Sequence, residues 1–318
     1  MKKLLAILVA GISFYRVPVA LAGPVNMTGD VSIKYERDTA DGAAGVSGMV
    51  YSTKLMGEVN LGAGWSGYAR LGAQHLTTSG LGDFNTNFGV YDMDKKSVLA
   101  VDQYGVIYKT TNLVYKLGRQ DVGVGKTALL YSRADSNIGK KTFVDGLTAS
   151  GTVGVMAVSA LIAQEDNADS LDNKIYAMRA GYSPRENLNW GLTLGRYQGP
   201  STESTNHWAV DGTYKFGKNS LTAEFTTSSS SVDNKAYAAI WNYEFDHKTA
   251  ASITGFRVES NGAMGQQSDF DNDNKGVHYG ITHNLSTADS LEIVYKAQKT
   301  ISGGQSNNKL EATFTHGF

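Results

Sequence analysis

Polar and apolar residues alternate along nearly the whole chain after Gly23, and this period of two limits its fold more than any other feature. In the stretch SLEIVYKAQKT, residues 290–300, Leu291 and Ile293 fall on one side of an extended strand and Glu292 falls on the other. Successive side chains of a β-strand point to opposite faces, so the pattern predicts strands that are apolar on one face only. We therefore expect an all-β fold.

Runs of this kind number about 16. They span residues 25–38, 48–61, 65–78, 97–109, 113–120, 142–150, 153–165, 173–184, 188–199, 207–217, 220–229, 235–245, 249–260, 275–285, 290–300 and 309–318. The division between 142 and 165 is ambiguous, so roughly 14 or 18 strands also fit the pattern. Each run is near the length of about 9–11 residues with which a tilted strand crosses a bilayer. The sequence predicts a transmembrane antiparallel β-barrel.

Connections between these runs alternate between short and long. The short ones are 62–64, 110–112, 185–187, 218–219, 246–248 and 286–289, and the long ones include 39–45, 79–96, 166–172, 200–206, 229–234, 261–274 and 301–308. Outer-membrane barrels have short periplasmic turns and longer external loops. We therefore expect the long connections outside, with 261–274 at the external rim.

The first 22 residues are expected to be a secretory signal peptide. Lys2 and Lys3 precede the apolar run Leu4–Phe14, and Ala20-Leu21-Ala22 supplies a small-x-small cleavage pattern. No linker or second pattern divides the remainder. Residues 23–318 are expected to form one barrel domain in the outer membrane.

Composition argues against other classes of protein. The chain has no cysteine, which excludes a disulfide framework in an exported protein. Three of its 29 basic residues lie in the signal peptide, so its 30 acidic residues are in excess once that segment is removed. No nucleic-acid partner is expected, because nucleic-acid binding needs a basic surface.

Two phosphate-binding motifs are incomplete. Gly125-Lys126-Thr127 ends as a P-loop ends, but Gln120 stands where its first glycine belongs, and no helix is expected after it. The segment 62–67, GAGWSG, matches a dinucleotide fingerprint, yet a strand pattern follows it. No Gly-x-Ser-x-Gly elbow occurs either. We expect no enzyme activity and no cofactor.

Signals for metal binding are weak. The six histidines show no ligand spacing such as His-x-x-x-His. DFDNDNKG, residues 269–276, resembles the start of a calcium loop, but Asn274 and Gly280 stand where a glycine and a bidentate glutamate are wanted. We expect no metal centre, and a weak divalent site at 269–276, shared with lipopolysaccharide-bound cations, is the alternative.

Two stretches carry a resemblance to a known family. The C-terminal KLEATFTHGF ends in Phe318, as do the final strands of barrels inserted by the barrel assembly machinery. The stretch 115–146, from YKLGRQ to FVDG, resembles the region where porins leave the fifth strand and fold a long third loop into the lumen. The chain thus resembles a Gram-negative general-diffusion porin. LGRQ and FVDG resemble in particular the porin barrels of diderm Firmicutes, although no cell-wall-binding domain is expected here.

The resemblance implies an aqueous pore narrowed by the third loop, with a plain surface loop as the alternative. The candidate constriction charges are Lys126, Arg133, Asp135, Lys140 and Lys141. Leu129, Leu130 and Tyr131 are expected to pack against the wall and leave the loop's bases facing water. By alternation, the candidate pore-wall bases are Lys34, Lys54, Arg70, Lys116, Arg179, Lys215 and Lys296. Acids are about as numerous on the same face, so only weak selectivity is expected.

The implied function is passive diffusion of small hydrophilic solutes and ions across the outer membrane. The expected partners are outer-membrane lipid, lipopolysaccharide, the barrel assembly machinery through Phe318, and further copies of the chain in a homotrimer. Two alternatives remain. A substrate-specific channel predicts block by one class of solute, and a structural anchor of the outer membrane predicts a plugged pore.

Overall fold

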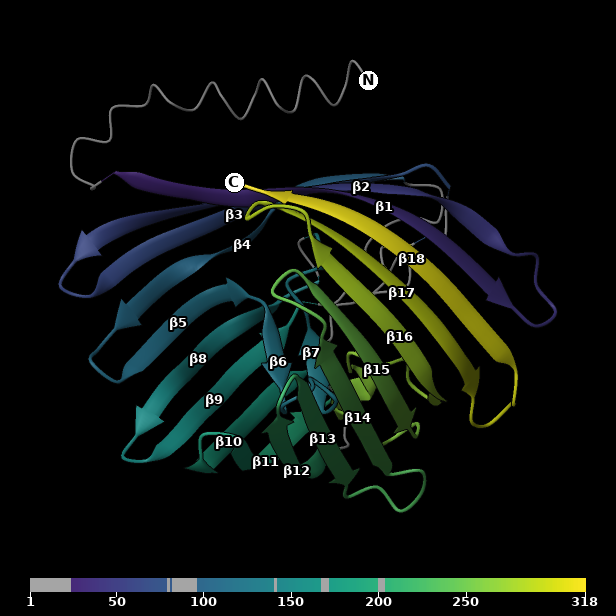
Figure 1. The fold of residues 1–318 in the computed structure, drawn as a ribbon. Helices are drawn as coiled ribbons and strands as arrows, with labels where there is room; N and C mark the ends of the chain where they lie inside the picture. The colour runs from purple at the N-terminus through teal and green to yellow at the C-terminus, as the bar shows by residue number, and fades with distance from the viewer. Residues whose placement is uncertain (1–23, 79–80, 82–95, 140–141, 167–171, 200–203) are drawn as a thin grey trace.

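The computed structural model describes residues 24–78, 81, 96–139, 142–166, 172–199 and 204–318. In these residues sixteen antiparallel strands close one barrel, which confirms the all-β barrel and the middle of the three strand counts (Figure 1). The barrel strands are β1 (Val25–Ala40), β2 (Val46–Gly62), β3 (Trp65–Leu76), β4 (Ser97–Lys109), β5 (Leu113–Gln120), β8 (Val144–Val153), β9 (Met156–Glu165), β10 (Lys174–Arg185), β11 (Leu188–Gln198), β12 (Ser204–Phe216), β13 (Asn219–Ser228), β14 (Lys235–Glu244), β15 (Thr249–Val258), β16 (Asn274–Asn284), β17 (Asp289–Thr300) and β18 (Ser306–Gly317).

The first and last strands close the barrel. β1 pairs with β18 from Asp30↔Gly317 to Ala40↔Asn307. At the end of this seam the backbones of Gly29 and Phe318 exchange two hydrogen bonds of 3.0 Å. This pairing joins the first strand to the last, so the sheet closes on itself.

Side chains sort by face as the alternation predicts. Ile33, Tyr35 and Leu291 lie among the exposed apolar side chains that cover the outside of the barrel. Their neighbours Lys34 and Glu36 point inward, where they meet other charged groups. Among the described residues, no helix is long and apolar enough to cross a membrane. The charged lumen and the apolar exterior both follow from the period of two.

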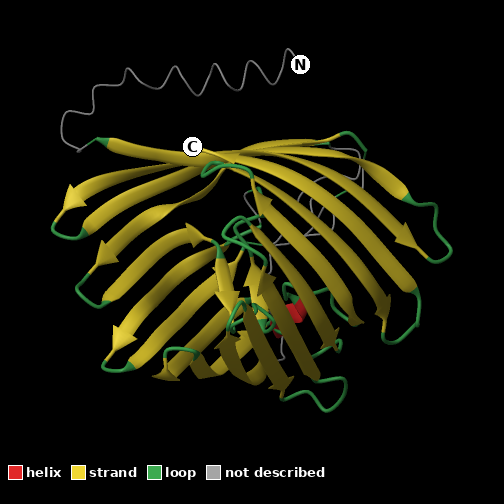
Figure 2. Cartoon of the chain, viewed as in Figure 1, coloured by secondary structure: helices red, strands yellow, loops and turns green. Residues whose placement is uncertain are grey.

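Short and long connections alternate between the two ends of the barrel (Figure 2). The turn between β8 and β9 lies at 154–155, whereas it was expected near 151–152, and β12 and β18 each begin three residues earlier than expected. Both Gly151 and Gly154 interrupt the pattern, but Gly154 has a φ of 60°, the left-handed conformation that a tight hairpin requires. Gly151 instead continues the strand and pairs with Leu113.

Within the described residues, two long connections turn inward rather than outward. The one between β5 and β8 contains a small hairpin that the sequence did not predict, made of β6 (Val122–Val124) and β7 (Tyr131–Arg133), and Figure 1 shows it inside the barrel. We call residues 121–143 the third loop. The connection between β15 and β16 carries the short 3₁₀ helix η2 (Met264–Gln266) and packs against it.

Candidate pore constriction

Apolar side chains hold the third loop against the inner wall. Leu129, Leu130 and Tyr131 are fully buried, which confirms that they pack against the wall. Leu129 joins a cluster with inward residues of β14 and β15, namely Ala236, Ala238, Phe256 and Val258. Leu130 and Tyr131 join a second cluster with Leu161, Ala163, Ile175 and Ala209 of β9, β10 and β12. The inner wall is thus apolar where the loop covers it, and burial of that surface favours the inward conformation.

A carboxylate of the wall anchors one end of the loop. Glu224, near the middle of β13, accepts hydrogen bonds from the backbone nitrogen of Thr127 at 2.6 Å and from its Oγ1 at 2.8 Å. Gly125 has a φ of 94°, and a Cβ at that position would lie 1.9 Å from Glu224 Oε1. Only glycine fits this approach, because the left-handed backbone and the carboxylate leave no room for a side chain.

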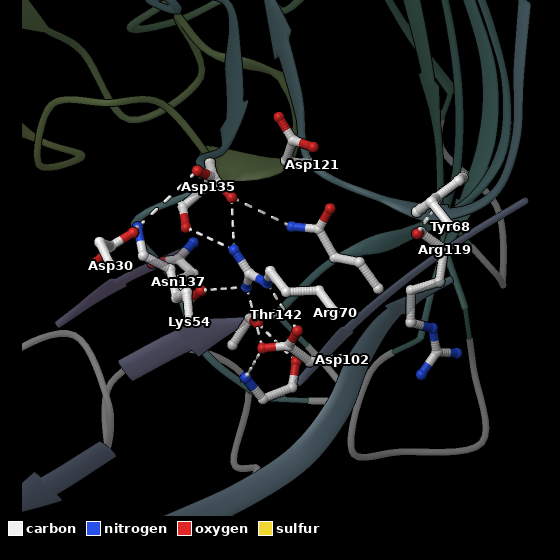
Figure 3. A network of polar contacts seen from close by, with 12 residues as sticks. Asp30, Lys54, Tyr68, Arg70, Asp102, Arg119, Asp121, Asp135, Asn137 and Thr142 are labelled. Atoms are coloured by element: carbon white, nitrogen blue, oxygen red, sulfur yellow. Dashed lines mark hydrogen bonds and ion pairs between the residues drawn. The ribbon is translucent and has the colours of Figure 1, made fainter. Parts of the chain in front are cut away.

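A guanidinium of the opposite strands anchors the other end. Arg70, near the middle of β3, donates to both oxygens of Asp102 at 2.8 and 2.9 Å (Figure 3). It also donates to Asp135 Oδ1 at 2.5 Å and to the backbone oxygen of Asn137 at 2.8 Å, both in the third loop. The loop therefore extends from β13 to β3 at about the mid-height of the barrel.

A β-bulge supplies the partner of Arg70. The register between β3 and β4 shifts after Arg70↔Gln103, so that the next pair is Leu71↔Val101 and Asp102 is the extra residue. Asp102 is fully buried and also accepts from the backbone nitrogen of Gly139 at 3.0 Å. Bulges re-aim side chains in this way. The sequence analysis missed Asp102, although the consecutive polar pair Asp102-Gln103 breaks the alternation of its strand and marks the bulge.

The expectation that Arg133 faces water is wrong. Its side chain is 1% exposed, and its guanidinium lies 3.0 Å from Oε1 of Glu165, which is 2% exposed. Arg133 also donates to the Tyr131 hydroxyl at 3.0 Å, and that hydroxyl donates to Glu165 at 2.8 Å. Burial raises the pKa of Tyr131 well above its ordinary value, so the hydroxyl stays protonated. Glu165 neutralises Arg133 beneath the loop, and this base does not line open water.

The position expected for the 261–274 connection is also wrong. Its backbone bonds directly to the third loop, with Met264 N donating to Leu130 O at 2.8 Å and Ser132 N donating to Gln267 O at 3.2 Å. Met264 and Phe270 are buried in the two clusters beneath. The physical reason is again the burial of apolar surface. The 261–274 connection has hydrophobic side chains of its own, which would stay exposed to water at the rim. This connection therefore packs against the third loop and supports it.

The part of the wall left uncovered carries a chain of ion pairs. Lys34 Nζ lies 2.6 Å from Glu36 and 2.9 Å from Glu311, and Lys296 Nζ lies 2.8 Å from Glu311. Lys309 Nζ lies 3.3 Å from Glu36. These residues come from β1, β17 and β18, and the described residues of the two clusters beneath the third loop include none from these strands. Bases and acids alternate here, so the wall has little net charge.

The remaining predicted residues fall into three groups. Lys126 and Asp135 are exposed on the third loop, and Lys54 Nζ lies 3.9 Å from Asp135 and 3.2 Å from Asp30. Other wall bases are paired or distant: Lys116 with Asp121 at 3.1 Å, Arg179 with Asp211 at 2.6 Å, and Lys215, exposed near the short-turn end of β12. Lys140 and Lys141 lie outside the described residues.

The acidic stretch 269–276 makes internal contacts. Asp271 accepts from Gln298, and Asp273 accepts from the Ser302 hydroxyl, which ties this connection to β17 and its following loop. Within the residues that the structure describes, no three histidine or carboxylate side chains gather as a metal ion would need. The two aspartates thus have a structural role as acceptors.

Comparison with known proteins gives likeness in structure alone. No family model and no curated protein match the sequence. Among solved structures, a triple mutant of the Rhodopseudomonas blastica porin matches with a TM-score of 0.59 and 10% identity, covering 92% of this chain and 100% of that chain. A variant of the same porin that includes four replacements of charged residues by alanine gives 0.61 and 9%, with the same coverage. The expectation of a porin-type fold is confirmed, and at this identity the likeness establishes the fold and nothing finer.

Proposed function

We propose that the protein is a pore of the outer membrane through which small hydrophilic solutes and ions diffuse passively. One observation carries the proposal. Asp135 is anchored to Arg70 near the middle of the barrel, yet its side chain is 61% exposed. A group at mid-height can be this accessible only if water reaches it along the barrel, and a barrel of sixteen strands is too wide for its own side chains to fill.

The third loop sets the narrowest section in this proposal. Lys126 and Asp135 lie on its free surface, and the ion pairs of β1, β17 and β18 lie on the wall left uncovered. Charges of both signs face the lumen in similar number, which supports weak selectivity. Fixed charges select ions only where one sign prevails at the constriction.

The proposal includes export and assembly. The first 22 residues act as the signal peptide, and residues 23–318 form the barrel domain; residues 1–23 lie outside the described residues. The barrel assembly machinery recognises the aromatic C-terminal residue, Phe318. The pairing of Phe318 with Gly29 at the closing seam supports a role for this residue in the last step of closure. The finer resemblance to the barrels of diderm Firmicutes stays a prediction.

The proposal also includes a homotrimer in contact with outer-membrane lipid and lipopolysaccharide. Closed cyclic symmetry would bury part of the apolar exterior of each barrel. The second loop, 79–96, was expected to latch over a neighbour, and most of it lies outside the described residues. Crosslinking in native membranes tests the trimer. If only the monomer is found after crosslinking, the trimer is contradicted.

Single-channel recording with purified, folded protein tests the pore. Discrete conductance steps with little ion preference are expected. If bilayers that contain the protein show no conductance steps, the pore is contradicted and a structural anchor is favoured. Steps that one class of solute blocks at low concentration would instead favour a substrate-specific channel. No catalysis and no cofactor enter this function.

A further inference from the structure

Basic side chains gather on the outside of the barrel at its long-loop end. The outward face of the strands carries six bases, each within two residues of the strand end at a long connection: Lys174, Arg196, Lys235, Arg257, Lys275 and Lys299. The outward face is otherwise a band of exposed apolar side chains. A ring of bases at one edge of such a band matches a layer of negative charge at that level.

Three of these bases form a row across neighbouring strands. Arg257 of β15 is paired directly with Lys275 of β16, and Lys275 is paired directly with Lys299 of β17. Side chains in such pairs have their Cβ atoms about 4.5–5.5 Å apart, and like charges there repel. Within the described part of the chain, neither Lys275 nor Lys299 forms an ion pair, and only Arg257 has one, with Glu259 at 3.2 Å. The row therefore carries uncompensated positive charge.

The same row lines a groove. An open cavity of about 520 Å³ lies over β14 to β18, and its lining includes the three bases together with Tyr237, Tyr279 and Asn308. Tyr279 is 47% exposed, so the groove opens on the outside of the barrel and not into the lumen. Tyr237 is paired directly with Arg257 at the end of the row, and Tyr279 lies four residues beyond Lys275 along β16. Basic groups beside aromatic rings suit a ligand with an anionic head and an apolar body.

From this geometry we propose that the groove binds the phosphorylated headgroup of an outer-leaflet lipid. Two lysines directly opposite each other offer six N–H donors to one phosphate, and binding removes the repulsion that they feel when the groove is empty. Tyr237 and Tyr279 cover the sugar or the start of the acyl chains. The inference rests on the proposed position of the barrel in the outer membrane, but not on the pore being open.

Native mass spectrometry of the detergent-solubilised protein tests the site. The protein is titrated with bis-phosphorylated lipid A, with the same lipid after removal of its phosphates, and with inorganic phosphate. K275Q/K299Q is expected to weaken binding of the phosphorylated lipid at least tenfold and to leave the dephosphorylated lipid unaffected. K174Q/R196Q is the matched control: it removes two outward bases at the same level, on β10 and β11, outside the groove, and should change affinity less than twofold.

Four results would overturn the site. Equal binding by wild type and K275Q/K299Q excludes the two lysines, and an equal loss in K174Q/R196Q reduces the effect to general attraction. Inorganic phosphate that binds as tightly as the lipid, or a variant that changes subunit number instead of lipid number, assigns the surface to another ligand. Conductance of the same preparations is recorded separately. A silent channel with normal lipid binding contradicts only the pore, and a normal channel with unchanged lipid binding contradicts only the site.

Discussion

Glu224 of β13 accepts two hydrogen bonds from Thr127 of the third loop, one from the backbone nitrogen and one from Oγ1. Thr127 ends the Gly-Lys-Thr sequence that in a P-loop surrounds a phosphate. Successive backbone N–H groups beside a left-handed glycine form a concave site for an anion whatever its source. In this protein the anion is a carboxylate of the opposite wall, and the motif fastens a loop.

Glu224→Ala should loosen this end of the third loop. Hydrogen bonds to a charged group contribute about 1.5–3 kcal/mol, so the unfolding free energy of the barrel should fall by that order. The open-channel current should also become noisier, since the loop tip then moves within the pore. Heat-modifiability gels and single-channel recordings measure the two effects. Glu244→Ala, an exposed change near the short-turn end of β14, is the control and should alter neither.

Gly125→Ala should act through the same anchor. The new Cβ would meet Glu224 Oε1 at 1.9 Å, and a φ of 94° is strained for alanine. We expect a loss of about 1–3 kcal/mol and the same rise in current noise. Gly123→Ala is the matched change two residues earlier, where the nearest atom is Ala128 Cβ at 3.5 Å. If the two variants behave alike, the anchor at Glu224 does not hold the loop.

The sequence predicted the barrel well because alternation reports directly on the two environments of each strand. It predicted most of the connections between strands closely. The β8–β9 turn was predicted less well, because Gly151 and Gly154 carry equal weight in a pattern. It also predicted where Leu129, Leu130 and Tyr131 go, since three adjacent apolar groups need apolar surface. These features are local, and local patterns suffice for them.

The partners of the charged residues could not be predicted in the same way. Arg133 and Glu165 are 32 positions apart in the sequence. Nothing in this spacing indicates that the third loop folds over the wall and brings the two side chains together. Asp102 and Gln103 are both buried, although they are consecutive, because a bulge shifts the register there. Such pairings depend on three-dimensional closure, so a single sequence identifies charged candidates but does not separate lumen charges from buried ion pairs.

Arg70→Gln should destabilise the barrel more than the loss of a surface charge does. It leaves Asp102 buried without its cation, and breaking a buried ion pair costs about 3–5 kcal/mol. It also frees Asp135 and Asn137, so the second anchor of the third loop is lost. Lys109→Gln, which removes an exposed partner of Glu58 at 3.7 Å, should cost at most about 1 kcal/mol. Thermal unfolding of the two variants that gave the same midpoint would contradict the buried network.

Deletion of Phe318 should slow assembly of the barrel. The Phe318 backbone forms the last two hydrogen bonds of the seam with Gly29, and its ring lies over Gly29, 3.0 Å from where a Cβ would be. Loss of both leaves the closing strands frayed at one end. The measurement is the yield of heat-modifiable barrel in membranes. Phe318→Tyr keeps an aromatic end and should assemble normally, whereas normal yield from the deletion would count against a final-strand signal.

Lys126→Glu should shift the pore toward cations. Lys126 is exposed on the third loop beside the Glu224 anchor, and the change reverses one charge at the proposed narrowest section. Charges in a narrow, low-dielectric passage act on ions more strongly than charges on an open surface do, because mobile ions screen them less there. The reversal potential in a tenfold potassium chloride gradient measures the shift. Lys248→Glu makes the same substitution in an exposed short turn between β14 and β15 and should leave the reversal potential nearly unchanged.

Arg133→Glu is the informative third variant, since its buried pairing with Glu165 predicts failure to fold and not a change in selectivity. If Lys248→Glu shifts the potential as far as Lys126→Glu, or if Arg133→Glu folds and shifts it further, the third loop does not set the constriction through Lys126.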